Sequence, residues 1–397
     1  MKLHEVEVRR GADTVRVVGR FEWRGDAQEL YFEYPSRFGD FVSPHADAFA
    51  AVMLPAAMRA GEDLAIVPPL SDALAFQLGR IRDVFHCWYP DEMQRIGLDL
   101  RARPRTAQRP RRRSATFFSG GVDSFYTLLK YRHGERLPSP LTHFVFMRGM
   151  AFPLDEAAEV EEGERAVTAV AERLGIDVIA GATNLRTVFP EPFLLWERHF
   201  FGSALAGTAL SLGAGVDHVC IPSSFTYRHL VPHGSHPMVD EWYSTEDVRL
   251  VHDGCEVTRA QKVAKSVEWD RDLVMQHLRV CIWNADGAAN CGRCRKCVRT
   301  AIALEILGVL RDMPSFVHKD RDAWESVASN DHLVLIEKNL ALARERRADP
   351  DLLALLERAA RSHVRREQLR SLAAAVRVEA LLPPVRDLYW SVRRSLR

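Results

Sequence analysis

A short glycine-containing segment, Ser119–Ser124 with the sequence SGGVDS, carries residue types that bind phosphate. Its glycines let the backbone approach a phosphate closely, because no Cβ atom stands in the way. The helical stretch that follows would present unpaired N–H groups and the positive end of its dipole to an anion. The serine hydroxyls can donate hydrogen bonds, and the carboxylate of Asp123 can hold Mg²⁺ or a water bound to it. We therefore predict a phosphate-binding loop made of Ser119, Gly120, Gly121, Val122, Asp123 and Ser124, with Asp123 and Ser124 also candidate catalytic residues.

Four of the seven cysteines lie close together in the sequence. Three of them are spaced at three-residue intervals in CGRCRKC, which is too polar to form a core strand. In a reducing compartment such a cluster indicates a metal site rather than disulfide bonds. Four thiolates can close a tetrahedron around Zn²⁺, and an iron–sulfur cluster is the alternative. The predicted metal ligands are Cys281, Cys291, Cys294 and Cys297.

The placement of the glycine segment resembles the pyrophosphate-binding loop of the PP-loop ATP pyrophosphatase superfamily. The segment directly follows the apolar strand ATFF and precedes a helix, and it is neither a Walker A motif nor a GxGxxG dinucleotide motif. With the cysteine spacing, it makes residues 115 to about 305 similar to the zinc-containing 7-cyano-7-deazaguanine synthases. The resemblance implies an enzyme that cleaves ATP to AMP and pyrophosphate. Such an enzyme adenylates a substrate carboxyl or carbonyl oxygen for attack by a nitrogen nucleophile, and its implied cofactors are ATP, Mg²⁺ and Zn²⁺.

The long regions on both sides of this central part depart from those synthases, and we therefore expect a relative that acts on a different substrate. An RNA-modifying sulfur transferase of the same superfamily is a second hypothesis. A sulfur carrier would then be needed, and Cys220 and Cys255 would have to serve, because the four clustered cysteines match a zinc site. A module that binds nucleotide without catalysis is a third hypothesis, which the intact loop disfavours.

Two further places are candidates for contact with the nucleotide. Met147 and Arg148 end the second predicted strand of the central part, where the resemblance places adenine and ribose; an ordinary turn is the alternative. Further along, Thr258–Gln261 predicts a capping box that opens a helix. Arg259 and Lys262 fall in the first turn of that helix, where the helix dipole disfavours cations. They are therefore candidates for binding phosphate, with Lys262 also a candidate catalytic residue, and solvent-exposed helix charges are the alternative.

A long polar loop between Pro222 and Tyr243 contains hydroxyl, carboxylate and imidazole groups. Long polar loops within compact domains are usually functional. Its three histidines suggest a metal, but interspersed prolines and a glycine disfavour helical ligand geometry, so we expect substrate or phosphate contacts instead. The residues singled out are Ser223, Ser224, Tyr227, Arg228, His229, His233, Gly234, Ser235, His236, Asp240 and Glu241.

The pattern of apolar residues predicts the elements that position these side chains. Between residues 115 and 300, short strands alternate with helical stretches, which predicts an α/β fold with a central, doubly wound parallel sheet of the PP-loop or Rossmann-like type. The patterns predict an N-terminal α+β domain over residues 1–100, an Arg/Pro-rich linker over 101–114 and an all-helical C-terminal region over 301–397. Ser71 is expected to cap a helix of the N-terminal domain.

Composition places the chain among ordinary globular proteins. Of 397 residues 47% are hydrophobic, and 54 Lys and Arg balance 53 Asp and Glu, so no general polyanion-binding field is expected. The longest uncharged stretch, Phe200–Val216, is too short for a membrane span and rich in small residues, which predicts a tightly packed core helix. The N-terminus lacks a signal-peptide pattern, and we expect a cytoplasmic protein without membrane contacts. The expected partners are ATP and an unidentified carboxyl- or carbonyl-bearing substrate; a homodimer is also considered, and nucleic acid is not indicated.

Overall fold

The computed structural model describes residues 1–104, 113–150, 154, 157–281, 289–322 and 324–375. The chain forms two compact units, Met1–Arg279 and Val280–Arg397. The boundary expected near residue 100 falls inside the first unit, and the boundary expected near residue 300 falls inside the second. The predicted phosphate loop and the four cysteines therefore belong to different units.

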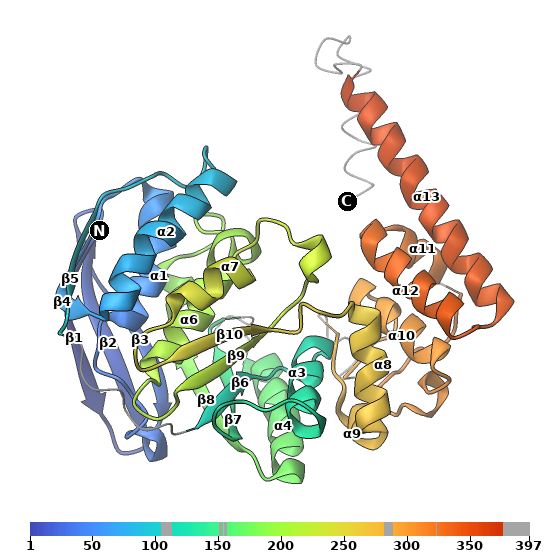
Figure 1. Ribbon diagram of the computed structural model, residues 1–397, viewed down its shortest axis with the longest axis horizontal. Helices are drawn as coiled ribbons and strands as arrows, with labels where there is room; N and C mark the ends of the chain where they lie inside the picture. Colours follow the sequence, from blue (N-terminus) through green and yellow to red (C-terminus); the bar gives the residue numbers. More distant parts are fainter. Residues whose placement is uncertain (105–112, 151–153, 155–156, 282–288, 323, 376–397) are drawn as a thin grey trace. The chain divides into compact units, whose positions relative to one another are not determined.

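The strands of the first unit are β1 (Lys2–Arg10), β2 (Thr14–Trp23), β3 (Asp26–Pro35), β4 (Leu64–Leu70), β5 (Leu98–Ala102), β6 (Ser114–Phe117), β7 (Leu141–Arg148), β8 (Asp177–Thr183), β9 (His218–Pro222) and β10 (Arg249–Asp253). Over the described residues they form one ten-stranded sheet in the order β10-β9-β6-β7-β8-β3-β2-β1-β4-β5 (Figure 1). The strands from β10 to β8 are parallel, as the strand–helix alternation predicted. The run from β8 to β1 is antiparallel, and β4 and β5 add parallel pairs at the edge. The fold is thus α/β with a large, mostly parallel sheet.

The N-terminal strands continue this sheet, where the sequence had suggested a separate α+β domain. β3 pairs with β8 in antiparallel register, with Phe32 opposite Thr183. Asn184 reinforces the junction, since its side-chain oxygen accepts the N–H of Tyr31 at 2.9 Å and its amide donates to the backbone oxygen of Glu29 at 2.9 Å. The first of these bonds joins residues 153 positions apart. A local sequence pattern cannot predict a pairing between residues so far apart in the sequence.

The helices of the first unit are α1 (Asp47–Ala60), α2 (Asp72–Trp88), α3 (Val122–His133), α4 (Ala157–Leu174), α5 (Leu185–Val188), α6 (Phe201–Ser211), α7 (Pro237–Asp240), α8 (Arg259–Trp269) and α9 (Arg271–His277). α3 packs against β6 and β9, and α4 packs against β7 and β8. The hydroxyl of Ser71 accepts the N–H of Leu74 at 3.1 Å, which confirms the predicted cap of α2. The sequence patterns missed β1, which is charged along its length, and β4, which contains two prolines.

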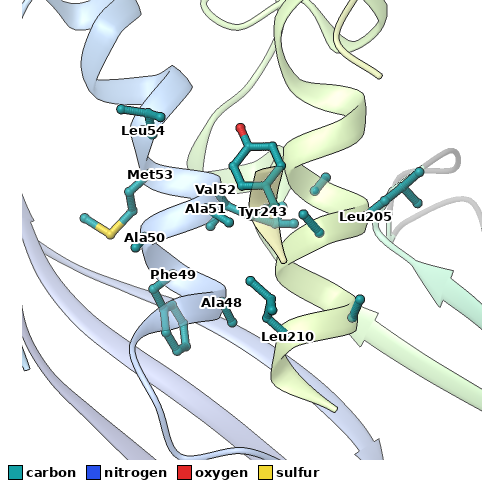
Figure 2. Close-up of a cluster of buried hydrophobic side chains, with 14 of the residues drawn as sticks. Ala48, Phe49, Ala50, Ala51, Val52, Met53, Leu54, Leu205, Leu210 and Tyr243 are labelled. Carbon is teal, nitrogen blue, oxygen red and sulfur yellow. The ribbon is translucent and has the colours of Figure 1, made fainter. Parts of the chain in front are cut away.

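The uncharged stretch predicted to be a core helix is α6, and small residues let it lie close against α1 (Figure 2). The residues from Gly202 to Ser211 are all buried. A Cβ atom at Gly207 would lie 2.6 Å from Cγ1 of Val52 and 2.9 Å from the carbonyl oxygen of Ala48. Glycine at this position therefore lets α6 lie against α1 without a clash.

From residue 301 onward, the regular elements that the structure describes in the second unit are helices, as predicted for residues 301–397. Its helices are α10 (Arg295–Ile306), α11 (Trp324–Ser329), α12 (Leu333–Glu345) and α13 (Pro350–Ala375). Arg299 of α10 makes two 2.7 Å hydrogen bonds to the carboxylate of Asp331, which lies between α11 and α12. This bidentate pair ties the three helices together.

Two predicted segments lie largely or partly outside the described residues. The Arg/Pro-rich linker is described only at its ends, where Arg103 makes a 2.7 Å ion pair with the buried carboxylate of Asp47. That end is therefore anchored to the first unit. The all-helical region is described as far as residue 375. Within the described ranges, no helix combines the length and apolar character that crossing a membrane requires.

Candidate functional site

The order of the parallel strands places a topological switch point between β6 and β9. β7 and β8 lie on one side of β6, whereas β9 and β10 lie on the other. Loops that leave the carboxyl ends of two such strands diverge, and open α/β sheets bind their ligands between them. Ser119–Ser124 follows β6 and Ser223 follows β9, so both stand at this point.

The predicted phosphate loop is shaped by its glycines and by Ser124. Gly120 has φ +75°, a left-handed conformation that favours glycine. Gly121 is the N-cap of α3 and has an extended backbone, with φ −80° and ψ 167°. Oγ of Ser124 donates to the carbonyl oxygen of Gly121 at 3.0 Å and accepts the N–H of Ser119 at 3.4 Å. The loop therefore opens on the N-terminus of α3, whose first N–H groups have no partner inside the helix.

Asp123, at the start of α3, is held between two cations of α8. Its Oδ2 atom lies 2.5 Å from Nη1 of Arg259, and its Oδ1 atom lies 3.1 Å from Nζ of Lys262. Lys262 is 1% exposed and also donates to the backbone oxygen of Ser223. Burial by itself would raise the pKa of Asp123, but Arg259 and Lys262 outweigh it and lower that pKa, so the group is a carboxylate. Ion pairs therefore connect α3 to α8, and the hydrogen bond of Lys262 connects α8 to the turn after β9.

A capping box sets the start of α8. The hydroxyl of Thr258 accepts the N–H of Gln261 at 3.3 Å, and the side chain of Gln261 accepts the N–H of Thr258 at 2.9 Å. Both bonds were predicted, and both are present. Arg259 and Lys262 are three positions apart and therefore share one face of the helix. Their pairing with Asp123 distinguishes them from solvent-exposed helix charges.

The structure adds a cation that the sequence patterns did not single out. The backbone N–H of Arg279 donates to the carbonyl oxygen of Gly120 at 2.8 Å, so this residue lies against the predicted phosphate loop. Its side chain is largely buried, with Nη1 3.6 Å from Oε1 of Glu162 on α4. One signal was available in the sequence, because Arg279 is the single charge in the run LRVCIW. An isolated charge in an apolar run needs a buried partner or a ligand.

Met147 and Arg148 stand at the end of β7, the strand beside β6. Phe117 lies opposite Val145 in the parallel pairing, which brings the end of β7 to the same edge of the sheet. A Cβ atom at Gly181 would lie 2.6 Å from Sδ of Met147, so the Met147 side chain packs in the core. Arg148 is exposed at the rim. The Met147 side chain is therefore not available to a ligand at this edge of the sheet, whereas the exposed side chain of Arg148 is.

The polar loop of residues 222–243 forms short helical turns with internal hydrogen bonds. His236 is the N-cap of α7 and accepts the N–H of Met238 at 3.1 Å. Nδ1 of His233 accepts the N–H of Ser235 at 3.2 Å. Among the described residues, the His, Cys, Asp and Glu atoms that gather closely enough to hold a metal ion are those of the four cysteines.

The second unit brings the four predicted metal ligands together. The Sγ atoms of Cys281, Cys291, Cys294 and Cys297 all lie within 4.8 Å of one another. Those of Cys291 and Cys297 are 3.8 Å apart, close to the edge of a tetrahedron whose Zn–S bonds are about 2.3 Å long. The N–H of Cys294 points at Sγ of Cys291 at 3.4 Å, and the N–H of Cys297 points at Sγ of Cys294 at 3.4 Å. These four cysteines could bind a metal such as zinc.

The turn that carries three of the cysteines depends on a glycine. Gly292 has φ +75°, and a Cβ atom there would overlap the carbonyl oxygen of His318. The neighbouring Cys294 and burial raise the pKa of the Cys297 thiol well above its usual range. Four thiolates in this place would therefore need a bound cation to balance them.

No family model matches this sequence, and the search of curated proteins returned no significant match. Function is therefore inferred from the residues of the site itself.

Proposed function

We propose that this protein is an ATP pyrophosphatase of the PP-loop type. It would cleave ATP to AMP and pyrophosphate and convert a carboxyl or carbonyl oxygen of its substrate into an adenylate for attack by a nitrogen nucleophile. The observation that carries the proposal is the charged cluster at the end of β6, where Asp123 is held by Arg259 and Lys262. This cluster lies where open α/β sheets bind ligands.

The residues of the cluster fit a nucleoside triphosphate and its metal ion. The N-terminus of α3 supplies N–H donors, and the two cations of α8 supply positive charge for phosphate oxygens. Each carboxylate oxygen of Asp123 has two lone pairs, so it can bond both a cation of α8 and Mg²⁺, which prefers oxygen ligands. Bound Mg²⁺ would neutralise charge on the phosphates and orient them.

Lys262 has the central role in the chemistry that we propose. Without nucleotide its ammonium group neutralises Asp123 and is fixed by the backbone oxygen of Ser223. In the reaction it would stabilise the negative charge that develops as the bond between the α and β phosphates breaks. A charge held in place beforehand, and 1% exposed, stabilises a transition state without reorganising at that moment.

For the four cysteines we propose a structural zinc centre in the second unit. A closed set of four thiolates leaves no open coordination position for a substrate. Its expected contribution is to the folding of the second unit.

The proposal is tested by measuring nucleotide products. The full-length protein would be incubated with MgATP, ammonium and 7-carboxy-7-deazaguanine, and the nucleotides and bases analysed by mass spectrometry. AMP together with an amide or nitrile of the base is expected if the resemblance extends to the substrate. AMP that forms only when a metabolite extract replaces the base keeps the ATP reaction and rejects this substrate. Absence of AMP under both conditions contradicts the proposal.

A pair of lysines on α8 provides the matched control. Lys262→Met should lower the rate of AMP formation by about 10²–10³-fold, because a preorganised charge is lost. Lys265→Met removes the same charge from the same helix, at a side chain that lies over the ring of Trp269 instead of beside Asp123. Equal losses in the two variants would show that Lys262 has no special role.

A further inference from the structure

A second cluster of chemically reactive side chains lies on the elements that follow β9 and β10. Nδ1 of His252, in β10, donates to Oδ2 of Asp240, in α7, at 2.7 Å. The thiol of Cys255 interacts with the same imidazole, and Sγ of Cys255 lies 3.0 Å from Oγ of Ser223. The three central residues are buried, with exposed fractions of 0% for Asp240, 6% for His252 and 1% for Cys255.

The buried charge of this cluster is costly for the fold. Burying an ionised carboxylate costs several kcal/mol of solvation free energy. Only well-placed hydrogen bonds and ion pairs offset that cost. Oδ2 of Asp240 accepts the Ser235 hydroxyl at 2.6 Å as well as the ring of His252. Oδ1 of Asp240 has no hydrogen-bond partner among the described residues. Buried titratable groups are candidates for function, because apolar side chains could fill the same space without the cost of burying a charge.

The imidazole is charged in this setting. Burial lowers the pKa of His252, but its bonds to Asp240 and Cys255 raise that pKa to about 9. An imidazolium beside a thiol favours the thiolate, which is the nucleophilic form of cysteine.

The thiol is connected to the nucleotide site through a short chain of contacts. Lys262 bonds Asp123 of the phosphate loop and the backbone oxygen of Ser223, and the hydroxyl of Ser223 contacts Cys255. Between β10 and Cys255 the chain turns at Gly254, which has φ +94°. A Cβ atom at Gly254 would lie 3.1 Å from Nζ of Lys262. The thiol and the loop of Asp123 are therefore linked through the same lysine.

We propose that Cys255, His252 and Asp240 form a Cys–His–Asp triad whose thiolate takes the acyl group from the adenylate before the nitrogen nucleophile attacks. In this triad Cys255 is the nucleophile, His252 holds the proton of the thiol, and the carboxylate of Asp240 orients the ring of His252. This inference rests on the proposed function, since the adenylate is the compound that the thiolate attacks.

The atoms balance in two steps. In the reactive form that we propose, Cys255 is a thiolate beside the His252 imidazolium, and this thiolate attacks the carbonyl carbon of the adenylate. A C–S bond forms, the bond between that carbon and the AMP oxygen breaks, and AMP leaves with the electron pair. Ammonia or an amine then attacks the thioester, the C–S bond breaks, and the thiolate of Cys255 is regenerated. The proton lost by the nitrogen passes to water, and the products are an amide and AMP.

The first test concerns the thiol alone and needs no ATP. The full-length protein would be treated with iodoacetamide near neutral pH, and the alkylation of each cysteine followed by peptide mass spectrometry. Cys87 is exposed and serves as the internal control. Alkylation of Cys255 should be at least about tenfold faster than that of Cys87, because only a small fraction of an ordinary thiol is ionised near neutral pH. His252→Gln and Asp240→Asn should each remove this advantage.

The outcomes of this first test are distinct. If Cys255 reacts more slowly than Cys87 in the wild-type protein, the inference is wrong, because a thiol that iodoacetamide cannot reach could not reach an adenylate either. That comparison does not depend on whether a variant folds. Rapid alkylation that survives both substitutions would also overturn the triad.

The second test separates the thioester from the ATP reaction. The full-length protein would be incubated with MgATP and 7-carboxy-7-deazaguanine without ammonium, quenched in acid and analysed by intact mass. One acyl group on Cys255, released by hydroxylamine, is expected. In Cys255→Ala, exchange of pyrophosphate into ATP should persist while product formation falls at least about 10²-fold. Cys220→Ala, which removes a buried thiol of β9 outside the triad, should keep both.

Three results would overturn the thioester. AMP without an adduct, or undiminished product formation in Cys255→Ala, rejects it and leaves the ATP pyrophosphatase standing. A persulfide in place of the acyl group assigns the thiol to sulfur transfer instead. Absence of both AMP and the adduct contradicts the proposed ATP reaction. It then also contradicts the thioester, because the thioester is formed from the adenylate.

Discussion

Asp123, in the predicted phosphate loop, pairs with two cations of α8, Arg259 and Lys262. Asp123→Asn keeps the shape of the side chain but removes the charge that Arg259 and Lys262 neutralise. It also weakens the oxygen ligands available to Mg²⁺. We expect AMP formation to fall by about 10²-fold, measured as initial rates with saturating MgATP. Asp13→Asn, at an exposed aspartate, is the matched control, and an equal loss in both variants would contradict the assignment.

The stabilisation that His252 gives to the folded protein should depend on pH. Because its folded-state pKa is raised from 6.5 to about 9, its contribution to stability is complete below pH 6.5 and is lost as pH rises through 9. That contribution is up to about 3 kcal/mol. The difference in unfolding free energy between wild type and His252→Gln should therefore shrink by about 2–3 kcal/mol between about pH 6 and about pH 10. Urea titrations measure this difference, and a constant value across the range would show that Asp240 does not hold a charged ring.

Among the helices, α1 and α6 pack tightly in the core (Figure 2). Gly207→Ala would push a methyl group into Val52 and the backbone of Ala48. We expect it to lower the unfolding free energy by about 1–3 kcal/mol, as overpacking does. Gly79→Ala, in α2, meets nothing within 4 Å and should raise the unfolding free energy by up to about 1 kcal/mol. Urea unfolding of both variants tests the packing, and effects of the same sign would refute it.

At the scale of the whole molecule, the two units should respond differently to metal removal. The four cysteines all belong to the unit that begins at Val280, so their metal is expected to stabilise that unit directly. Chelation, or Cys297→Ser, should lower the zinc content from one ion per chain and speed amide hydrogen exchange across α10–α12. Protection in the strands of the first unit should remain. Cys87→Ser is the control and should keep the metal. Retention of zinc by Cys297→Ser would contradict the site.

Features that depend on neighbouring residues could be predicted from the sequence. The strand–glycine–helix order of the phosphate loop, the cap at Ser71 and the capping box at Thr258 are each set within a few positions, and all three are present in the structure. The cysteine spacing is equally local, and the thiols do gather. Helix caps and turns form where a short stretch can satisfy its own backbone hydrogen bonds. Local sequence patterns therefore predict them.

Which distant segments meet could not be predicted and became clear from the folded structure. It joined β3 to β8, so that a predicted N-terminal domain became part of the sheet. It placed Asp123 against Arg259, 136 positions away. It also brought His252 to Asp240, and Cys255 to Ser223, whose backbone oxygen Lys262 binds. Such contacts depend on strand order and on the packing of helices over the sheet, and no local propensity encodes them. The sequence could name the loop and the cations separately, but their mutual neutralisation, and the buried thiol next to them, exist only once the sheet is assembled.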